Sequence, residues 1–146
     1  MVFAGQEVRV NDAFGAWTTF TPSWINLSVN NGSTAGEWRR IADFMIFLRA
    51  QVTWGSTTAA SGTIGLTLPG SLSGEGASAR QHMPIWGFDS SASGGFVGTA
   101  VLQSGGGTNL DRFYGPTVSA GWAATVPITW ATGDIIELQG WIRTTS

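Results

Sequence analysis

The chain has 146 residues and a net charge of −2, with no cysteine, no lysine and seven arginines. A single domain of this length buries roughly 70% of its unfolded surface, so it can hold a core without disulfides. The absence of cysteine excludes thiolate metal sites and a cysteine nucleophile, and the scattered arginines form no basic patch of the kind that binds nucleic acid.

The composition favours an all-β protein. The chain is 42% hydrophobic, which is too apolar for a disordered segment, and it combines 21 glycines and eight tryptophans with few charges. Short strands joined by glycine-rich turns have this composition. Residues 1–10 carry neither a basic opening nor a long apolar run, so we expect no export signal and no membrane insertion.

Residues 1–16 form a segment that is too short for a core of its own and too apolar for a free tail. Its apolar side chains are separated by glycine and polar residues: Phe3, Val8, Val10 and Phe14. We therefore expect an N-terminal arm that anchors on a partner. A single domain should follow over residues 17–146.

The first expected strands are residues 18–21 and 23–29, which are separated by Pro22. In the second strand, alternation places one set of side chains inward: Ile25, Leu27 and Val29. The Asn-Gly pair at 31–32 is a strong hairpin signal. Residues 37–41 should therefore return antiparallel to residues 23–29.

The clearest strand pattern lies within residues 37–54. From residue 44 onward, the even positions are all apolar: Phe44, Ile46, Leu48, Ala50, Val52 and Trp54. This period of two predicts a strand with one face on a core. A helix is the alternative, because positions 41, 44, 45, 48 and 52 also fit a spacing of three and four, but the flanking glycines and the aromatic and β-branched content favour a strand. With a turn at 42–43, the segment becomes a hairpin.

The odd face of this strand is also apolar, because Met45 and Phe47 lie opposite the even positions. A strand that is apolar on both faces is covered twice, either within its own domain or by another subunit. We therefore assign Met45 and Phe47, together with the apolar residues of the arm, to a contact with another subunit or with a shell.

The remaining expected strands are short and separated by glycine and serine runs: 63–68, 85–89, 96–103, 111–114, 125–130 and a last strand after a turn at 131–134. The last strand should place Ile136, Leu138 and Ile142 on one face, with Glu137, Gln139 and Arg143 on the other. About eight to ten such strands predict an antiparallel two-sheet β-sandwich, jelly-roll-like in topology.

Candidate catalytic groups are sparse. His82 is the only histidine, and a Ser-His-Asp site with Asp89 lacks the G-x-S-x-G pattern around any serine. The carboxylates are scattered singly, without the spacing of a metal site. Paired carboxylates for glycoside hydrolysis could come only from distant residues such as Glu37 and Glu137. We expect no enzyme, no metal and no cofactor.

Tryptophan is the residue type with the most potential for ligand binding. The eight are Trp17, Trp24, Trp38, Trp54, Trp86, Trp122, Trp130 and Trp141. Flat indole faces stack on sugars in β-sandwich lectins, but aromatic side chains also dominate cores and subunit contacts. We favour core and contact roles for any single one, and a host-surface glycan remains open as a ligand.

Four segments carry a resemblance to a known family. They are residues 17–24 (WTTFTPSW), 36–43 (GEWRRIAD), 61–69 (SGTIGLTLP) and 128–134 (ITWATGD), followed by a closing strand. In this order they resemble small β-domains in virion proteins of tailed bacteriophages that infect actinobacteria, often the outer domain of minor tail or fibre proteins. The opening Phe3-Ala4-Gly5-Gln6 is similar to the start of such proteins.

The resemblance implies a non-enzymatic virion surface protein, made in the host cytoplasm and often a homotrimer. Its partners would be other virion proteins, either the major capsid protein or tail proteins. A single compact domain with a short arm, without a coiled coil or collagen-like shaft, favours a capsid decoration protein. A tail-fibre or tail-tip protein that recognises host carbohydrate is the alternative.

Overall fold

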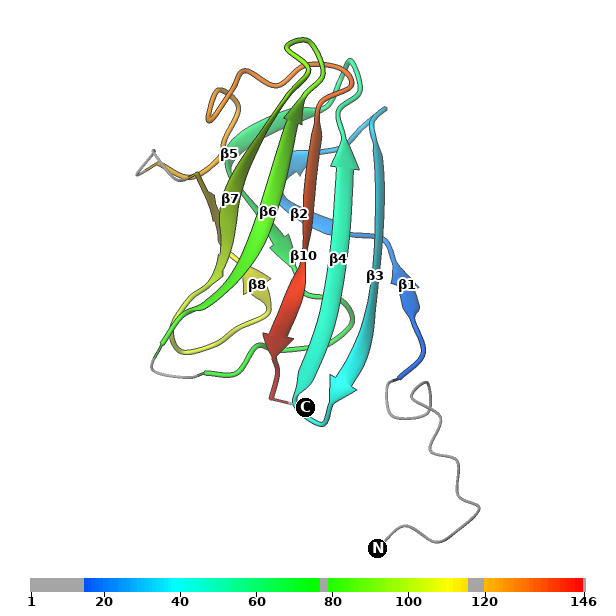
Figure 1. Cartoon of the computed structure of the whole chain (residues 1–146), viewed down its shortest axis with the longest axis vertical. Helices are drawn as coiled ribbons and strands as arrows, with labels where there is room; N and C mark the ends of the chain where they lie inside the picture. The colour runs from blue at the N-terminus through cyan, green and yellow to red at the C-terminus, as the bar shows by residue number, and fades with distance from the viewer. Residues whose placement is uncertain (1–14, 77–78, 116–119, 146) are drawn as a thin grey trace, which may run out of the picture.

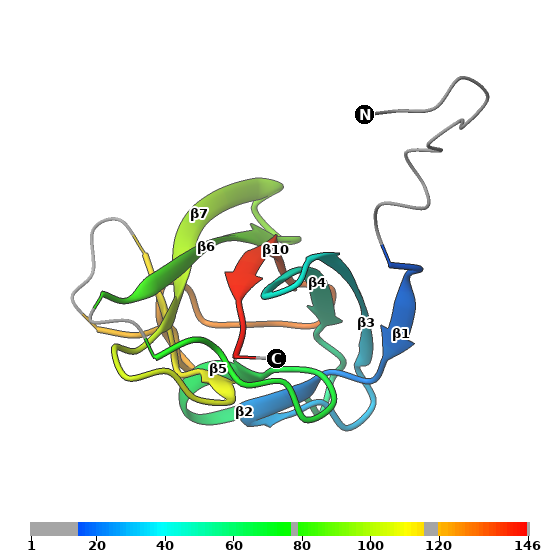
Figure 2. The ribbon, with the colours of Figure 1, turned by 90° about the horizontal axis from the view of Figure 1, so that it is seen from below.

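The computed structural model describes residues 15–76, 79–115 and 120–145, which form two antiparallel sheets packed together (Figure 1). Their strands are β1 (Thr18–Phe20), β2 (Ser23–Ser28), β3 (Ser33–Ala42), β4 (Met45–Thr53), β5 (Ala59–Thr67), β6 (Gln81–Asp89), β7 (Gly94–Leu102), β8 (Asn109–Leu110), β9 (Arg112–Tyr114) and β10 (Ile135–Arg143). The larger sheet has the order β1-β3-β4-β10-β6-β7-β9, and the smaller one β2-β5-β8. Figure 2 shows the larger sheet arching over the smaller. The predicted all-β two-sheet sandwich is confirmed.

The long hairpin predicted within residues 37–54 is formed by β3 and β4, which pair from Ser33 with Thr53 to Ala42 with Met45. The inward side chains of β4 are buried: Ile46, Leu48, Ala50 and Val52. Each large apolar side chain buried in this way stabilises the fold by about 1.5–3 kcal/mol. The pattern placed Phe44 on the buried face as well, but its side chain is 58% exposed. The turn lies at residues 43–44 rather than at 42–43, which takes Phe44 out of the strand.

β2 departs from the predicted alternation. Asn26 has a φ of 55°, and a register shift separates Ile25 from Leu27 in the pairing with β5. A bulge of this kind inserts one residue and reverses the faces beyond it. As a result Trp24 and Leu27 are buried, whereas Ile25 is only half-buried.

The Asn30–Gly32 turn does not close a hairpin, contrary to the prediction. It leads from β2 in the smaller sheet to β3 in the larger one. The Asn31 side chain accepts a hydrogen bond from the Thr57 backbone N–H (2.9 Å) and donates one to the Ser56 hydroxyl (2.8 Å). The turn is therefore fixed to the loop between β4 and β5, and β2 pairs with β5 instead.

The strand predicted at residues 125–130 is absent, and an irregular segment stands in its place. Trp130 stacks on Trp54 with ring centroids 4.6 Å apart, and its indole N–H donates to the Ala123 carbonyl (2.9 Å). Trp122, which is fully buried, contacts the rings of Phe113 and Trp130. The apolar residues here close one end of the core with aromatic side chains rather than extend a sheet.

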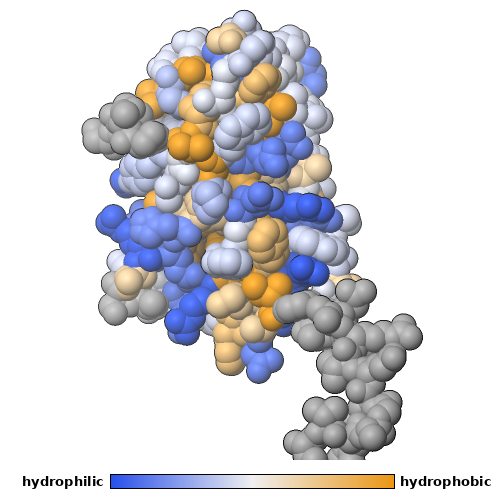
Figure 3. All heavy atoms as spheres, viewed as in Figure 1, coloured by the Kyte–Doolittle hydropathy of each residue, from blue (hydrophilic) through white to orange (hydrophobic). Residues whose placement is uncertain are grey.

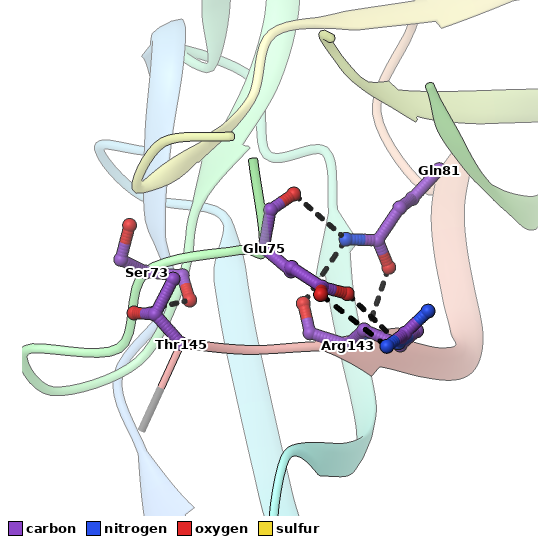
Figure 4. Close-up of polar contacts among 5 residues, drawn as sticks. All are labelled: Ser73, Glu75, Gln81, Arg143 and Thr145. Carbon is purple, nitrogen blue, oxygen red and sulfur yellow. Dashed lines mark hydrogen bonds and ion pairs between the residues drawn. The ribbon is translucent and has the colours of Figure 1, made fainter. Parts of the chain in front are cut away.

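At the other end of the sandwich, the loop after β5 is bound to the end of β10 (Figure 4). Arg143 forms an ion pair with Glu75 (2.8 Å). The Gln81 side chain accepts a hydrogen bond from the Arg143 backbone N–H (2.8 Å) and donates one to its carbonyl (3.0 Å), as a neighbouring strand would. The Thr145 N–H donates to the Ser73 carbonyl (2.9 Å). The polar groups of this cluster bind one another, so it acts as a structural clamp.

Candidate binding face

The outer face of the larger sheet is not covered by the smaller sheet, which packs on its inner face. Among the described residues, five large hydrophobic side chains are exposed, and this face carries four of them: Trp17, Trp86, Val97 and Trp141. Trp141 is 65% exposed, whereas Trp17 and Trp86 are each 40% exposed. Figure 3 shows this face, with a hydrophilic band between more apolar areas above and below. Three exposed tryptophans on one face make it a candidate contact or ligand site.

β10 lies at the centre of this face, between β4 and β6. Its buried side chains alternate with outward ones, so that Glu137, Gln139 and Trp141 point away from the core, as the sequence pattern predicted for the first two. Trp141 lies opposite Phe47 of β4, and Glu137 lies opposite Trp86 of β6. Residues from three strands therefore meet on one surface.

Two shallow hollows adjoin each other here. One, of about 310 Å³, is lined by Pro84, Ile85, Trp86, Val97, Glu137 and Gln139. The other, of about 270 Å³, is lined by Phe47, His82, Pro84, Gln139, Gly140 and Trp141. Because they share Pro84 and Gln139, they form one continuous depression, which we call the Trp86–Trp141 groove.

Trp86 is held in place by its neighbours on β6 and β7. Its ring stacks on Phe88, with centroids 5.5 Å apart and an interplanar angle of 21°. A Cβ at Gly95 would lie 2.7 Å from the Trp86 indole nitrogen, so only glycine leaves room for the ring in this position. The sequence alone did not indicate this role of Gly95, because the contact depends on the pairing of β6 with β7.

The polar groups of the groove are available to a ligand. Within the described residues, the side chains of His82, Glu137 and Gln139 form no hydrogen bond or ion pair with another residue. This differs from the clamp, where Glu75, Gln81 and Arg143 bind one another. A ligand in the groove would therefore not have to compete with protein partners.

Beside the groove, Trp17 packs edge-on against Phe47, with ring centroids 6.0 Å apart. The guanidinium groups of Arg39 and Arg49 lie 4.7 and 4.8 Å from the Trp17 ring centre, within the range of cation–π attraction. Arg49 also pairs with Glu37. Trp17 of the same chain therefore covers part of Phe47, where the sequence pattern predicts another subunit or a shell.

The residues predicted to form an intermolecular contact are only partly visible. Met45 and Phe47 are half-buried on the outer face, and their contact with another subunit or shell stays a prediction. The other four, Phe3, Val8, Val10 and Phe14, lie outside the described residues.

The structure does not bring the candidate Ser-His-Asp residues together. His82 and Asp89 lie at opposite ends of β6, about 23 Å apart at the usual rise per residue. The Asp89 carboxylate instead accepts hydrogen bonds from the Ser91 hydroxyl (2.7 Å) and from the backbone N–H groups of Ser91 and Ala92. The Ser91 hydroxyl, followed by these N–H groups, lowers the pKa of Asp89 below its ordinary 3.8.

Glu37 and Glu137, the candidate carboxylate pair, do line one hollow, of about 350 Å³. They belong to β3 and β10, which β4 separates, and the Glu37 carboxylate is already bound to Arg49. Across residues 15–76, 79–115 and 120–145, no three histidine, aspartate or glutamate side chains are grouped to hold a metal ion. The same ranges contain no helix of the length and apolar character needed to cross a membrane.

Compared with known proteins, the chain matches no family model, and no curated protein or solved structure shows significant similarity to it.

Proposed function

We propose that this chain is a non-enzymatic structural protein on the surface of a bacteriophage virion, most simply a capsid decoration protein. The resemblance of four segments to phage virion domains supports the assignment to a virion. The observation that supports a binding role is the outer face of the larger sheet, where Trp17, Trp86 and Trp141 stay exposed. A protein that binds only the assembled particle raises the stability of that particle by mass action.

A homotrimer would present three copies of this face and of the arm to the particle. Linked copies bind more tightly than single ones, because after the first contact the others become intramolecular. We expect a native mass of about three times 15.3 kDa for the isolated protein, measured by sedimentation velocity. A monomer would contradict the trimer.

Locating the protein in intact particles tests the proposal directly. Cryo-electron microscopy of the phage that encodes the chain should show the sandwich as repeated density on the capsid. Density at the tail tip would select the alternative, a tail-fibre or tail-tip protein. Absence of the protein from the particle would refute both assignments.

The arm is tested by deleting residues 1–16. The shortened chain keeps Trp17 and its contact with Phe47, so the circular dichroism spectrum should match that of the full chain. Binding to particles that lack the protein should be lost. Unchanged binding would show that the arm is not the anchor.

The enzymatic alternative is glycoside hydrolysis by Glu37 and Glu137. We expect no release of reducing ends from host wall or capsule polysaccharide. Release that disappears in the Glu137→Gln variant would overturn the non-enzymatic assignment.

A further inference from the structure

We propose that the Trp86–Trp141 groove binds a neutral oligosaccharide. This site goes beyond a structural role on the virion, and it stands on the groove's own geometry. It would serve a capsid protein and a tail protein equally, so it does not depend on where the chain is located.

The side chains of the groove match the two faces of a sugar ring. A pyranose has an apolar face of C–H groups, which packs on an indole, and a hydroxyl edge, which needs donors and acceptors. Trp86 and Trp141 supply the indoles. Glu137 and Gln139 supply a carboxylate that accepts and an amide that both donates and accepts.

The spacing of the two tryptophans indicates an oligosaccharide rather than a single sugar. Trp86 lies opposite Glu137 across the β6–β10 pair, and Trp141 is four residues further along β10. At the usual strand rise this places the two positions about 14 Å apart along the sheet, which is longer than one ring. Glu137 lies beside Trp86, and Gln139 lies between the two positions, where the middle sugars would sit.

The Trp86 end of the groove is arranged before any ligand arrives. Phe88 and Gly95 hold the Trp86 indole, and no described residue occupies the hydrogen-bonding groups of Glu137 or Gln139. A preorganised site loses less conformational entropy on binding than a flexible one.

The charges favour a neutral ligand. Glu137 is the one formally charged residue that lines the groove, and it would repel an acidic sugar. The nearest arginines are already engaged, Arg49 by Glu37 and Arg143 by Glu75. A peptide added as an extra strand is disfavoured as well, because that mode needs a sheet edge, and β10 and β6 both have neighbours on each side.

Saturation-transfer NMR on the full chain tests the site. The probes are maltohexaose, cellohexaose, mannohexaose and fully N-acetylated chitohexaose, with hexagalacturonate as the acidic control. We expect transfer to at least one neutral probe and none to the acidic one. Trp86→Ala and Trp141→Ala should each weaken binding by about tenfold or more, which equals ~1.4 kcal/mol.

Two further variants make the test specific. Trp17→Ala removes an indole with the same 40% exposure as Trp86. Because Trp17 lines neither hollow of the groove, the sugar affinity of this variant should stay within about twofold of that of the unaltered chain. Gly95→Ala keeps the Trp86 indole but displaces it, because the added Cβ would meet the indole nitrogen. This variant should weaken sugar binding. Because Gly95 is exposed, the protein should stay folded, which circular dichroism checks.

Three results would overturn the proposal. The first is no transfer to any neutral hexasaccharide at millimolar concentration. The second is a loss in Trp17→Ala equal to that in Trp86→Ala, which would indicate nonspecific adhesion to aromatic surface. The third is conversion of an oligomer to a monomer by Trp86→Ala or Trp141→Ala in sedimentation velocity, which would make the groove a contact between copies of the chain.

Discussion

Replacing Asp134 by alanine should lower the free energy of unfolding by about 3 kcal/mol. This side chain is only 1% exposed. Its carboxylate accepts hydrogen bonds from the Ser90 N–H (2.9 Å), the Ser90 hydroxyl (2.9 Å) and the Ala131 N–H (2.7 Å). It thereby ties the turn before β10 to the loop after β6.

The magnitude follows from the groups that would be left without a partner. The Ser90 hydroxyl keeps the Thr132 carbonyl as an acceptor (3.3 Å), so the loss falls on two backbone N–H groups. An unsatisfied buried donor costs about 1–3 kcal/mol. Two such donors together would cost about 2–6 kcal/mol. Since these groups are only partly buried, the loss should lie in the lower half of that range.

Thermal and urea unfolding, followed by circular dichroism, measure the effect. For a chain of this size, ~3 kcal/mol corresponds to a melting temperature lower by about 6–12 °C. Asp43→Ala is the matched control, because Asp43 lies exposed in the β3–β4 turn and should change stability by at most about 0.5 kcal/mol. A loss in Asp134→Ala of less than 1 kcal/mol would refute the role given to these hydrogen bonds.

Three other changes test separate parts of the structure. Gly106→Ala should lower the free energy of unfolding, measured in urea, by more than Gly105→Ala does. Both glycines have positive φ (77° and 94°), but only at Gly106 would the new Cβ meet a backbone oxygen, at 2.5 Å; equal losses would contradict this steric reason. An NMR titration should find the pKa of Asp89 below 3.8, and Ser91→Ala should raise it, because the Ser91 hydroxyl is the main cause of the lowering. A carboxylate with a lowered pKa stabilises the fold above its unfolded pKa, and this contribution is lost as the pH falls through the folded value. Phe47→Ser should reduce the native mass by breaking the oligomer while the protein stays folded, since Phe47 is only half-buried. Unfolding instead would place Phe47 in the core.

The β3–β4 hairpin could be predicted because its alternation is long and uninterrupted. Ile46, Leu48 and Val52 are fully buried, as the period of two required. A helix would have placed Ile46 on the side opposite Leu48 and Val52, so the pattern and the sheet agree. The turn was misplaced at Phe44, where alternation continues past the last paired residue, and β3 begins at Ser33 rather than at residue 37.

The errors have a common physical cause, since tertiary contacts override local patterns. Asn26 adopts a left-handed backbone conformation, which asparagine tolerates, and the bulge there reverses the faces of β2. No apolar pattern in the sequence signals such a bulge. Around Trp130, an alternating apolar segment packs its rings into the end of the core rather than joining a sheet. The Asn-Gly pair marked a turn correctly, but β2 pairs with the distant β5 rather than with β3.

The candidate groove was only half readable from the sequence. The outward direction of Glu137 and Gln139 was predicted from alternation, and Trp141 has the same parity. Trp86 was indistinguishable from the core tryptophans until the pairing of β6 with β10 placed it opposite Glu137. A site assembled across strands that are distant in sequence depends on register, which composition and spacing do not specify.

The two roles proposed for the outer face meet at Phe47, which lines the Trp141 end of the groove, and they separate at Trp86. Phe47 is contacted by Trp17 on the side of β1 and β3, where Arg39 and Arg49 also gather. Trp86 lies on β6, beyond β10, on the other side of Phe47. A subunit contact through Met45 and Phe47 would leave the Trp86 end of the groove open to solvent. Phe47→Ser should therefore change the native mass, whereas Trp86→Ala should change sugar binding alone. If Trp86→Ala also changed the native mass, the face would act as one surface with a single partner.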